Sequence, residues 1–502
     1  EFRRVLFRSF FIVGHYIGTQ ILKNQVGTTL LTFPTPSSSV NNTAFLAKIN
    51  SSGTSVLYAR IVDGSLDNDF GYGVACDSLG NNYFVGMYNR SAILKTEANT
   101  NIITLPTTLG NTAFLLKFDS SGTYQYSRIV TSSGSFEMGM SVSCDSSNNV
   151  YFGGVYNVGT ATLRDPTNIL LTYPGSTGSF AAFSTKLDTS GNHLYSLVLD
   201  TTNQDDPYSV TCDSSQNMYM CGDYNGTPTI KFVNSSNVSS NVGTLPTSTG
   251  SAAYVSKFNS SGTYQYTRLV DATGGDIGWS VACDTSSNMY MAGQYSTATP
   301  LIRAVNSSNV TSNIGSLQTP VTSNSAAFVI KFDSSGTYNP VPSYSSVSIS
   351  SNTFTRIVDG TGSEIGYGVA CDSSGNMYLA GQYDTAAPTI KDQAGNSLGT
   401  LPAPSGTTAF VSKFNSSGNY QYSRIVNGTG WSVTCDSSGN MYMAGYYNTA
   451  SPIIKDQAGN SLGTLPASSG QAGVVCKFNT LDRKSTRLNS SHVSESRMPS
   501  SA

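Results

Sequence analysis

Several acidic residues of this chain have a type and spacing that suit the binding of a ligand. Each stands three positions before a large side chain. The pattern recurs five times, and each copy comes shortly before a Val-x-Cys-Asp segment. Carboxylates beside aromatic rings suit a cation, a sugar or a peptide as ligand. A sixth copy lacks four residues at this point and carries Trp431. The five pairs are Asp69 with Tyr72, Glu137 with Met140, Asp205 with Tyr208, Asp276 with Trp279, and Glu364 with Tyr367.

The same carboxylates also have a structural interpretation, in which they cap loops or pair with arginines that recur elsewhere. Twelve of the 20 basic residues outside the two ends of the chain return at fixed positions of the repeat. Because they return in every repeat, we expect them to pair or pack within their own repeat, without a catalytic role. They are Arg60, Arg128, Arg268, Arg356 and Arg424, with Lys48, Lys117, Lys186, Lys257, Lys331, Lys413 and Lys477.

An aspartate follows each recurring cysteine and opens a segment such as Asp-Ser-Ser-Gly-Asn. Its oxygen atoms are of the kind that Ca²⁺ binds, but the spacing differs from the D-x-[DN]-x-[DN]-G calcium loop. Asp at the first position and Gly at the fourth are typical of a type I turn closed by a left-handed Gly. We therefore predict that these aspartates cap their own turns, with no metal and no cofactor. They are Asp77, Asp145, Asp213, Asp284, Asp372 and Asp436.

Six of the eight cysteines occupy one equivalent position of the repeat, immediately before these aspartates. Equivalent positions in neighbouring repeats are expected to lie farther apart than the roughly 7 Å between Cα atoms that a disulfide allows. A metal site needs paired ligands, and between the two ends there is no C-x-x-C pair and no histidine besides His15 and His193. We therefore expect small buried side chains. Unpaired thiols favour a reducing compartment, whereas eleven N-x-[ST] sequons point to a secreted chain.

Four apolar segments recur in a fixed order, and these must position the residues above. Strand A ends at the recurring cysteine, strand B ends in Gly-x-Tyr, strand C carries the lysine and strand D the arginine. Short turns join A to B and C to D, so each repeat is predicted to be a four-stranded antiparallel meander. A longer excursion between B and C is predicted to form a small hairpin on the rim. In strand B neither face is strongly polar, which indicates a sheet covered on both sides.

Repeated four-stranded sheets that are apolar on both faces are what a β-propeller needs, because each blade packs between two neighbours. The chain holds seven B strands, seven C strands, six A strands and six D strands. They form five complete blades between an initial B-C-D set and a final A-B-C set. We therefore predict an all-β fold, a seven-bladed β-propeller whose terminal blades each lack a strand. An arc of a longer array is the alternative. In a propeller the connections from strand D to strand A lie together on one face near the central channel, so we predict that the acidic and aromatic residues before strand A form a ligand-binding collar there.

Both ends of the chain, residues 1–9 and 482–502, resemble translated sequencing-adapter DNA, so we expect the propeller to span residues 10–481. Without the ends, the 27 Lys and Arg fall to 20 and the 29 Asp and Glu fall to 26, a net charge near −6. This balance excludes a footprint for nucleic acid or an anionic membrane. No apolar run approaches the roughly 18 residues that span a bilayer.

The sequence resembles the seven-bladed β-propeller (SBBP) repeat over residues 10–481. The resemblance rests on Gly-x-x-Val-Ala-Cys-Asp-Ser-Ser-Gly-Asn-Met-Tyr-x-Ala-Gly, followed by Ala-Phe-Val-Ser-Lys-Phe-Asn-Ser-Ser-Gly and Tyr-Ser-Arg-Ile-Val. It implies a propeller of the kind found mostly in large secreted or surface-associated proteins, with no general catalytic activity. The chain departs from the family by carrying Cys in place of Val in strand A. Extracellular, surface and intracellular locations therefore all stay open.

These features favour a non-catalytic scaffold that mediates protein or surface interaction, because each recurring residue returns with the blade whereas catalytic sites are asymmetric. A carbohydrate-binding propeller is the alternative, since Tyr, Trp, Asn and Asp suit a sugar. A propeller enzyme such as a glycosidase or lyase comes third. It requires one repeat to break the pattern, and only the repeat with Asp205, Asp206 and His193 does so. We expect a monomer that binds an unknown protein or glycan.

Overall fold

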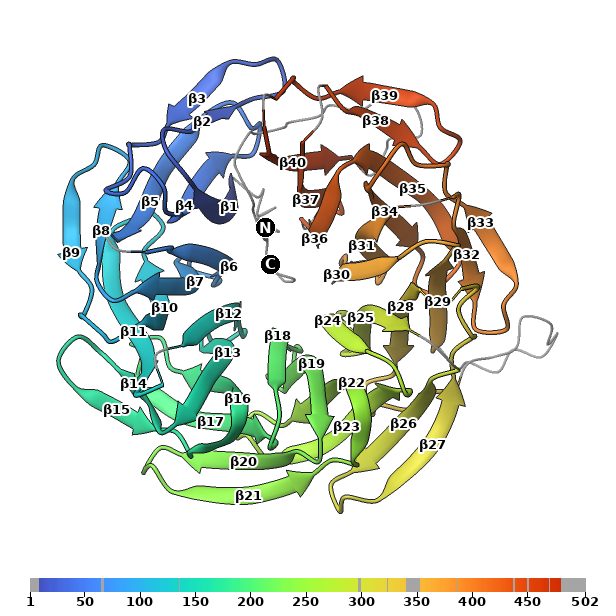
Figure 1. The fold of residues 1–502 in the computed structure, drawn as a ribbon, viewed down its shortest axis with the longest axis horizontal. Coiled ribbons are helices and arrows are strands. Elements are labelled where there is room, and N and C mark those ends of the chain that lie inside the picture. Colours follow the sequence, from blue (N-terminus) through green and yellow to red (C-terminus); the bar gives the residue numbers. More distant parts are fainter. Residues whose placement is uncertain are drawn as a thin grey trace, which may run out of the picture.

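The computed structural model describes residues 9–479 apart from gaps at 65–66, 135, 297–298, 323, 340–352, 385, 437, 449–450 and 469. The segments predicted to be adapter-derived lie outside the described residues, except that Ser9 begins the first strand. Every regular element of the described residues is a β-strand. Figure 1 shows these strands arranged as blades around a central axis, which confirms the all-β, seven-bladed propeller.

The innermost position of each blade is held by strand A, where the blade has one. The A strands are β6 (Phe70–Cys76), β12 (Glu137–Cys144), β18 (Asp205–Cys212), β24 (Ile277–Cys283), β30 (Ile365–Cys371) and β36 (Thr429–Cys435). The B strands are β1 (Ser9–Tyr16), β7 (Asn82–Asn89), β13 (Val150–Gly159), β19 (Met218–Gly226), β25 (Met289–Ser296), β31 (Met377–Tyr383) and β37 (Met441–Tyr447).

Strands C and D follow outward in each blade. The C strands are β4 (Thr43–Asn50), β10 (Asn111–Phe118), β16 (Ser176–Leu187), β22 (Ser248–Phe258), β28 (Ser325–Phe332), β34 (Thr408–Phe414) and β40 (Ala472–Phe478). The D strands are β5 (Val56–Gly64), β11 (Tyr124–Ser132), β17 (His193–Asp200), β23 (Tyr264–Asp271), β29 (Phe354–Asp359) and β35 (Tyr420–Asn427). All pairings are antiparallel, as the meander predicts; β10, for example, pairs with β7 on one side and β11 on the other.

The excursion between strands B and C forms a hairpin, as predicted, but the hairpin joins the sheet of the preceding blade. Complete blades therefore have six strands, as in the order β6-β7-β10-β11-β14-β15, and the predicted four-stranded meander is their inner part. The hairpin covers the outer edge of strand D, which would otherwise be open to pairing with another chain. The hairpins are β2 (Ile21–Lys23) with β3 (Thr29–Thr32), β8 (Ala92–Thr96) with β9 (Asn101–Thr104), β14 (Ala161–Arg164) with β15 (Ile169–Thr172), β20 (Thr229–Asn234) with β21 (Ser239–Thr244), β26 (Leu301–Asn306) with β27 (Thr311–Ser316), β32 (Thr389–Asp392) with β33 (Ser397–Thr400), and β38 (Ile453–Asp456) with β39 (Ser461–Thr464).

The ring closes where the first and last blades meet. The first blade is β1-β4-β5-β8-β9 and the last is β36-β37-β40, so each has fewer described strands than the others. Ile12 and Tyr16 of the first blade share a buried cluster with Tyr442 and Val475 of the last. The rings of Phe10 and Tyr442 are 5.6 Å apart between centroids. A closed ring, and not an open arc, is therefore the arrangement of the described residues.

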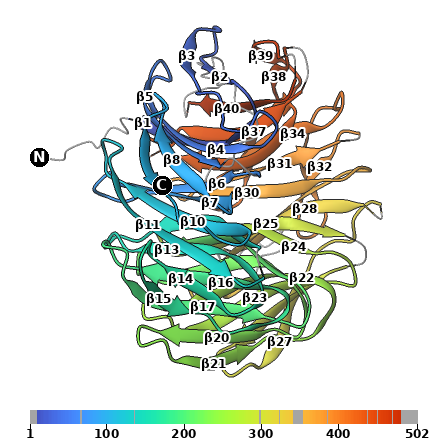
Figure 2. The same cartoon turned by 60° about the vertical axis from the view of Figure 1, so that its left-hand side comes forward.

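The core lies between neighbouring blades, because each sheet buries side chains on both faces. Val85 and Leu115 of one blade pack with Phe152 and Phe183 of the next in a single buried cluster. Figure 2 shows the twisted sheets stacked side by side around the ring. Each blade therefore depends on its two neighbours for its apolar cover.

The turn between strands A and B has its fourth residue in the left-handed region, as predicted. Glycine holds this position in three repeats, for example Gly375 at φ +73°. Asn148, Gln216 and Ser287 hold it in the other three, with φ between 60° and 63°. A side chain with a Cβ atom is strained in this region by roughly 1 kcal/mol.

We predict that Ser287→Gly raises the free energy of unfolding by about 0.5–1 kcal/mol, because it relieves this strain. The reverse substitution, Gly375→Ser, should lower it by a similar amount. Urea denaturation followed by tyrosine fluorescence measures both changes. A destabilised Ser287→Gly variant would show that the turn is not strained as described.

Candidate functional site

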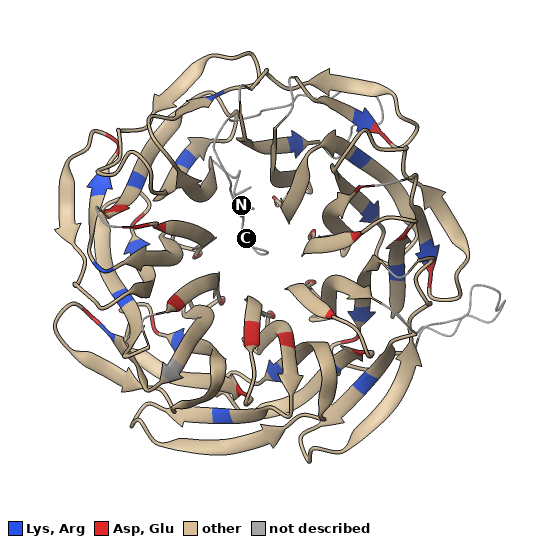
Figure 3. Ribbon diagram, in the orientation of Figure 1, with Lys and Arg blue, Asp and Glu red and all other residues tan. Residues whose placement is uncertain are grey.

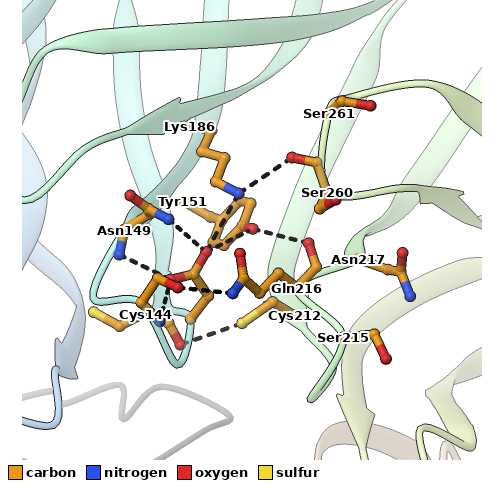
Figure 4. A network of polar contacts seen from close by, with 12 residues as sticks. Cys144, Asn149, Tyr151, Lys186, Cys212, Ser215, Gln216, Asn217, Ser260 and Ser261 are labelled. Atoms are coloured by element: carbon orange, nitrogen blue, oxygen red, sulfur yellow. Dashed lines mark hydrogen bonds and ion pairs between the residues drawn. The ribbon is translucent and has the colours of Figure 1, made fainter.

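Figure 4 shows the polar network around Tyr151, at a turn between strands A and B. A buried aspartate, Asp145, closes this turn. Oδ1 of Asp145 accepts hydrogen bonds from the backbone N–H groups of Ser147 and Asn149. Oδ2 accepts from the Asn149 amide at 2.9 Å and from the Tyr151 hydroxyl at 3.2 Å. The predicted turn cap is thus confirmed, and the other five aspartates make the same four bonds. Among the described residues, no cluster of three or more His, Cys, Asp or Glu is arranged to hold a metal ion.

The recurring lysine of strand C links this network to the next blade. Nζ of Lys186 lies 3.3 Å from Asp145 Oδ2 and 5.0 Å from the centre of the Tyr151 ring. The same Nζ donates a hydrogen bond to the carbonyl oxygen of Ser260 in the following blade (Figure 4). The equivalent donors and acceptors are Lys48 with Ser120, Lys117 with Thr189, Lys257 with Ser334, and Lys331 with Ser416.

The recurring arginine of strand D also reaches the next blade. Nε of Arg356 donates to the carbonyl oxygen of Gly418 at 2.7 Å, while the guanidinium lies over the Phe354 ring. The equivalent pairs are Arg60 with Gly122, Arg128 with Gly191, and Arg268 with Gly336. The prediction that these side chains pair within their own repeat is therefore wrong for this bond, because the C–D turn of the next blade lies against strand D.

All eight cysteines have free thiols. Cys221, Cys435 and Cys476 are buried, and the other five are partly buried. Burial raises the pKa of the Cys76 and Cys212 thiols to about 12, so both stay protonated and weakly nucleophilic near neutral pH. The Cys212 thiol donates to the carbonyl oxygen of Cys144 in the neighbouring blade. Of the six recurring cysteines, only Cys435 is buried as predicted, and the other five are partly buried.

The five acidic residues predicted to form a ligand-binding collar have no solvent exposure. Each caps the loop that enters strand A. Oδ2 of Asp276 accepts from the Ala272 backbone N–H at 2.6 Å, and Oε2 of Glu364 accepts from that of Gly360 at 3.0 Å. The others follow the same plan: Asp69 accepts from the Gly64 N–H, Asp205 from the Thr201 N–H and Glu137 from the Ser132 hydroxyl. These contacts are the loop caps of the structural interpretation. Binding of a ligand by these carboxylates stays a prediction.

The five aromatic side chains of the predicted collar are partly exposed, and three of them form an arc along neighbouring innermost strands. The ring centroids of Tyr208 and Trp279 are 4.3 Å apart, and those of Trp279 and Tyr367 are 5.3 Å apart. Each of the three stands at a β-bulge of strand A, a feature that re-aims a side chain. Tyr72 and Trp431 occupy the same position in their blades; Tyr72 contacts Met138, and Trp431 packs on Tyr446. The structure therefore brings together three of the five predicted aromatic residues.

A pair of carboxylates beside this arc was not predicted. Asp206 on β18 and Asp223 on β19 face each other across the two strands, where Figure 3 shows acidic segments side by side. Gln204 and Tyr208 donate to Asp206 Oδ2, at 2.6 Å and 3.3 Å. Burial, and then the neighbouring Asp206, raise the pKa of Asp223 to about 7. A sequence signal existed, since Gly222-Asp-Tyr stands where two later repeats have Gly-Gln-Tyr.

His193 does not join these acidic residues. It begins β17, whereas Asp205 follows the loop at the other end of that strand. An eight-residue strand is roughly 25 Å long. The His193 Nε2 atom lies 3.0 Å from the Ser196 hydroxyl, and burial lowers the histidine pKa to about 4. The repeat that departs from the pattern thus has no histidine beside its carboxylates.

Comparison with known proteins gives one curated relative of this chain at low identity. An uncharacterized WD repeat-containing protein of Acanthamoeba polyphaga mimivirus is 22% identical in a 294-residue alignment that covers 54% of this chain. The match spans only 20% of that relative's length. No family model matches the chain, so membership in the SBBP family is not shown.

The fold of this chain overlaps only weakly with the solved structures to which it is similar. A eukaryotic initiation factor aligns over 97% of this chain and 98% of its own, with 10% identity and a TM-score of 0.32. A protein of unknown function from Bacteroides caccae aligns over 65% and 91%, with 9% identity and a TM-score of 0.24. These values carry no functional argument. In the part of the chain that the structure describes, no helix is long and apolar enough to cross a membrane.

Four of the buried acidic residues that cap these loops have a raised pKa, which favours the protonated carboxyl group. Burial raises the pKa of Glu137, Asp276 and Glu364 to about 7 and that of Asp205 to about 8. In three of them, the second carboxyl oxygen is buried and has no described hydrogen-bond partner. An unfolded chain releases these protons near pH 4. The folded state therefore holds protons that the unfolded state has lost between about pH 4 and 7.

We predict that Glu364→Gln makes the free energy of unfolding less dependent on pH between pH 5 and 8. In the wild type, stability from this group is present at low pH and is lost as the pH rises to about 7. The amide keeps the cap without a titrating proton, so the difference should be on the order of 2 kcal/mol by pH 8. Urea denaturation at four pH values measures the slope. Asp67→Asn, an exposed change, is the control, and equal slopes in wild type and Glu364→Gln would contradict the prediction.

Proposed function

We propose that this chain is a non-catalytic β-propeller scaffold of the SBBP type that binds a protein partner at the aromatic side chains of its innermost strands. The recurring charged residues support this proposal, because their contacts lie within and between blades. Buried Asp, Lys and Arg side chains close turns and join neighbours, so the repeated groups have structural partners. The side chains that differ from blade to blade are therefore the ones that can recognise a partner.

The observation that carries the proposal is the arc of Tyr208, Trp279 and Tyr367 with Asp206 and Asp223 beside it. Tyr and Trp are enriched at protein interfaces, because their rings bury large areas at a low cost in conformational entropy. Arg and Lys side chains bind both aromatic faces and carboxylates. A partner segment with basic residues therefore matches the chemistry of this surface.

A carbohydrate ligand is the second candidate, and the same rings favour it. Trp279 is held by a hydrogen bond from its Nε1 to Oε1 of Gln294 at 3.2 Å, which fixes an aromatic face beside polar groups. Sugars stack on such faces while carboxylates and amides accept or donate to their hydroxyl groups.

Two parallel screens with the purified chain separate these candidates: a phage-displayed peptide library and a glycan array. We expect enrichment of peptides with basic residues. Asp206→Asn together with Asp223→Asn should weaken their binding about tenfold or more, because the carboxylates carry the charge complementarity. Trp279→Ala should weaken it as well, whereas Leu57→Ala, an exposed change on β5, should not.

Two results would contradict the protein-binding proposal. Glycan binding that is lost in the Trp279→Ala, Trp431→Ala double variant, with no enriched peptide, would favour the carbohydrate ligand. Peptide binding that is unchanged by all of these substitutions would place recognition on another surface.

A further inference from the structure

At the turns between strands A and B, a tyrosine bonded to an aspartate has a lysine beside it. The Tyr151 hydroxyl donates to Asp145 Oδ2 at 3.2 Å, while Nζ of Lys186 lies 3.3 Å from that oxygen and 5.0 Å from the ring centre. Three further blades have the same contacts, in the sets Tyr219, Asp213 and Lys257; Tyr290, Asp284 and Lys331; and Tyr378, Asp372 and Lys413. The fold thus supplies a positive charge to these tyrosine–aspartate pairs.

Tyr208 and Asp206 form a similar pair on the innermost strand β18, but without a cation. The Tyr208 hydroxyl donates to Asp206 Oδ2 at 3.3 Å, and Asp223 lies opposite Asp206 on β19. All three side chains are partly exposed. Among the described residues, no Lys or Arg lies over the Tyr208 ring, and neither carboxylate forms an ion pair. Two carboxylates beside one aromatic ring therefore have no described positive charge to balance them.

The strands around this site do not carry such a charge. No described A strand or B strand contains Lys or Arg, although these strands carry the carboxylates of Glu137, Asp205, Asp206 and Asp223. The recurring lysines and arginines stand farther out, on strands C and D (Figure 3). A surface with carboxylates and no cations attracts a positively charged ligand from solution.

The arrangement favours a guanidinium over an ammonium group. An ammonium is a compact charge, and that of Lys186 contacts one carboxylate and one carbonyl oxygen. A guanidinium presents five donors in one plane, so it can bond two carboxylates while its face stacks on an aromatic ring. It is also less strongly hydrated, which lowers the cost of leaving water at a partly buried site. The chain itself uses this stacking, since the Arg268 guanidinium lies 4.2 Å from the centre of the Tyr266 ring.

We propose that Asp206, Tyr208 and Asp223 hold one arginine side chain of the protein partner. Its guanidinium bonds both carboxylates and stacks on the Tyr208 ring. Trp279, whose ring centroid is 4.3 Å from that of Tyr208, extends the apolar surface for the methylene groups of the arginine. This inference rests on the proposed function, because it names the residue by which the partner binds the aromatic arc. It adds that lysine does not replace arginine at this position of the partner.

Binding of the arginine should release a proton from Asp223. Burial, and then the neighbouring Asp206, raise the pKa of Asp223 to about 7. The titratable groups near it are Asp206 and Tyr208 on β18, Cys221 on β19 and Tyr254 on β22. The strands β12, β13 and β24 beside them carry no Lys, Arg or His. A guanidinium stays charged and favours the ionised carboxylate, so its affinity should rise as the pH rises through 7.

Nuclear magnetic resonance of the full chain with isotope-labelled tryptophan tests the proposal, because the chain has only two tryptophans. The probe is N-acetyl-arginine-N-methylamide, and the indole N–H signal of Trp279 reports its binding. Trp431, which packs on Tyr446 outside the arc, is the internal control, and Trp431→Phe assigns the two signals. We expect a saturable shift of the Trp279 signal. The matching lysine amide should bind about fivefold more weakly, and the uncharged citrulline amide should cause no shift.

Substitutions of the two carboxylates test their contacts with the probe. Asp206→Asn and Asp223→Asn should each weaken its binding about tenfold, whereas Asp67→Asn, an exposed change, should not. The wild type should bind the probe about fivefold more tightly at pH 8 than at pH 6, and Asp223→Asn should remove most of this difference. Urea denaturation checks that each variant is folded, and the comparison of the three amides needs no variant.

The proposal is overturned if the Trp279 signal does not move, if the lysine or citrulline amide binds as tightly as the arginine amide, or if neither aspartate variant weakens binding. Equal affinity at pH 6 and pH 8 would overturn the contact with Asp223. A peptide library enriched equally in lysine and arginine would also overturn it and leave the proposed function intact. A saturable Trp279 shift without any enriched peptide would support the arginine site and contradict the protein partner.

Discussion

A hydrogen bond from a strand D arginine to a turn of the next blade joins four pairs of neighbouring blades among the described residues. Apolar packing between blades buries area but does not by itself fix how one blade is rotated against the next. The Arg356 guanidinium helps to fix this rotation. Its Nε donates to the carbonyl oxygen of Gly418 in the next blade, while its Nη1 donates to the carbonyl oxygen of Thr355 in its own strand. A planar guanidinium presents several donors in a fixed geometry, which suits a bond that must hold two sheets in register.

One blade shows what happens without this arginine. Leu197 stands at its position in β17. The ring of Phe232 lies against Gly262 of the next turn, where Arg60 lies against Gly122 in the first blade. Phe232 also stacks on Tyr195, with ring centroids 5.9 Å apart. An apolar pair has replaced a buried charge, a substitution that costs little when volume and packing are kept.

The regular parts of this fold could be predicted from the sequence because they depend on neighbours in the chain. The turn at Asp372 depends on an aspartate and on a left-handed residue three positions on, here Gly375, and both stand within one short segment. The hairpin β14–β15 was predicted as a hairpin, but its partner β11 belongs to the preceding blade, and no local signal gives that choice. Arg356 is similar, since its acceptor Gly418 lies 62 residues away.

The candidate site could be predicted only in part, because its arrangement also depends on residues that are far apart in the chain. The aromatic positions follow from the repeat, and three of them do meet. The burial of Asp276 and its equivalents does not follow from residue type, because acidic side chains are mostly exposed unless they have partners. Asp223 became significant only when the pairing of β18 with β19 set it opposite Asp206.

The most direct test of this description is the stability of Arg268→Met. Nε of Arg268 donates to Gly336 of the next blade, and the side chain is buried. Removing a buried hydrogen bond from a charged group should lower the free energy of unfolding by about 2–3 kcal/mol in urea denaturation. Arg90→Met, at an exposed position, should leave it unchanged. An Arg268→Met variant as stable as the wild type would contradict the claim that these bonds hold the blades together.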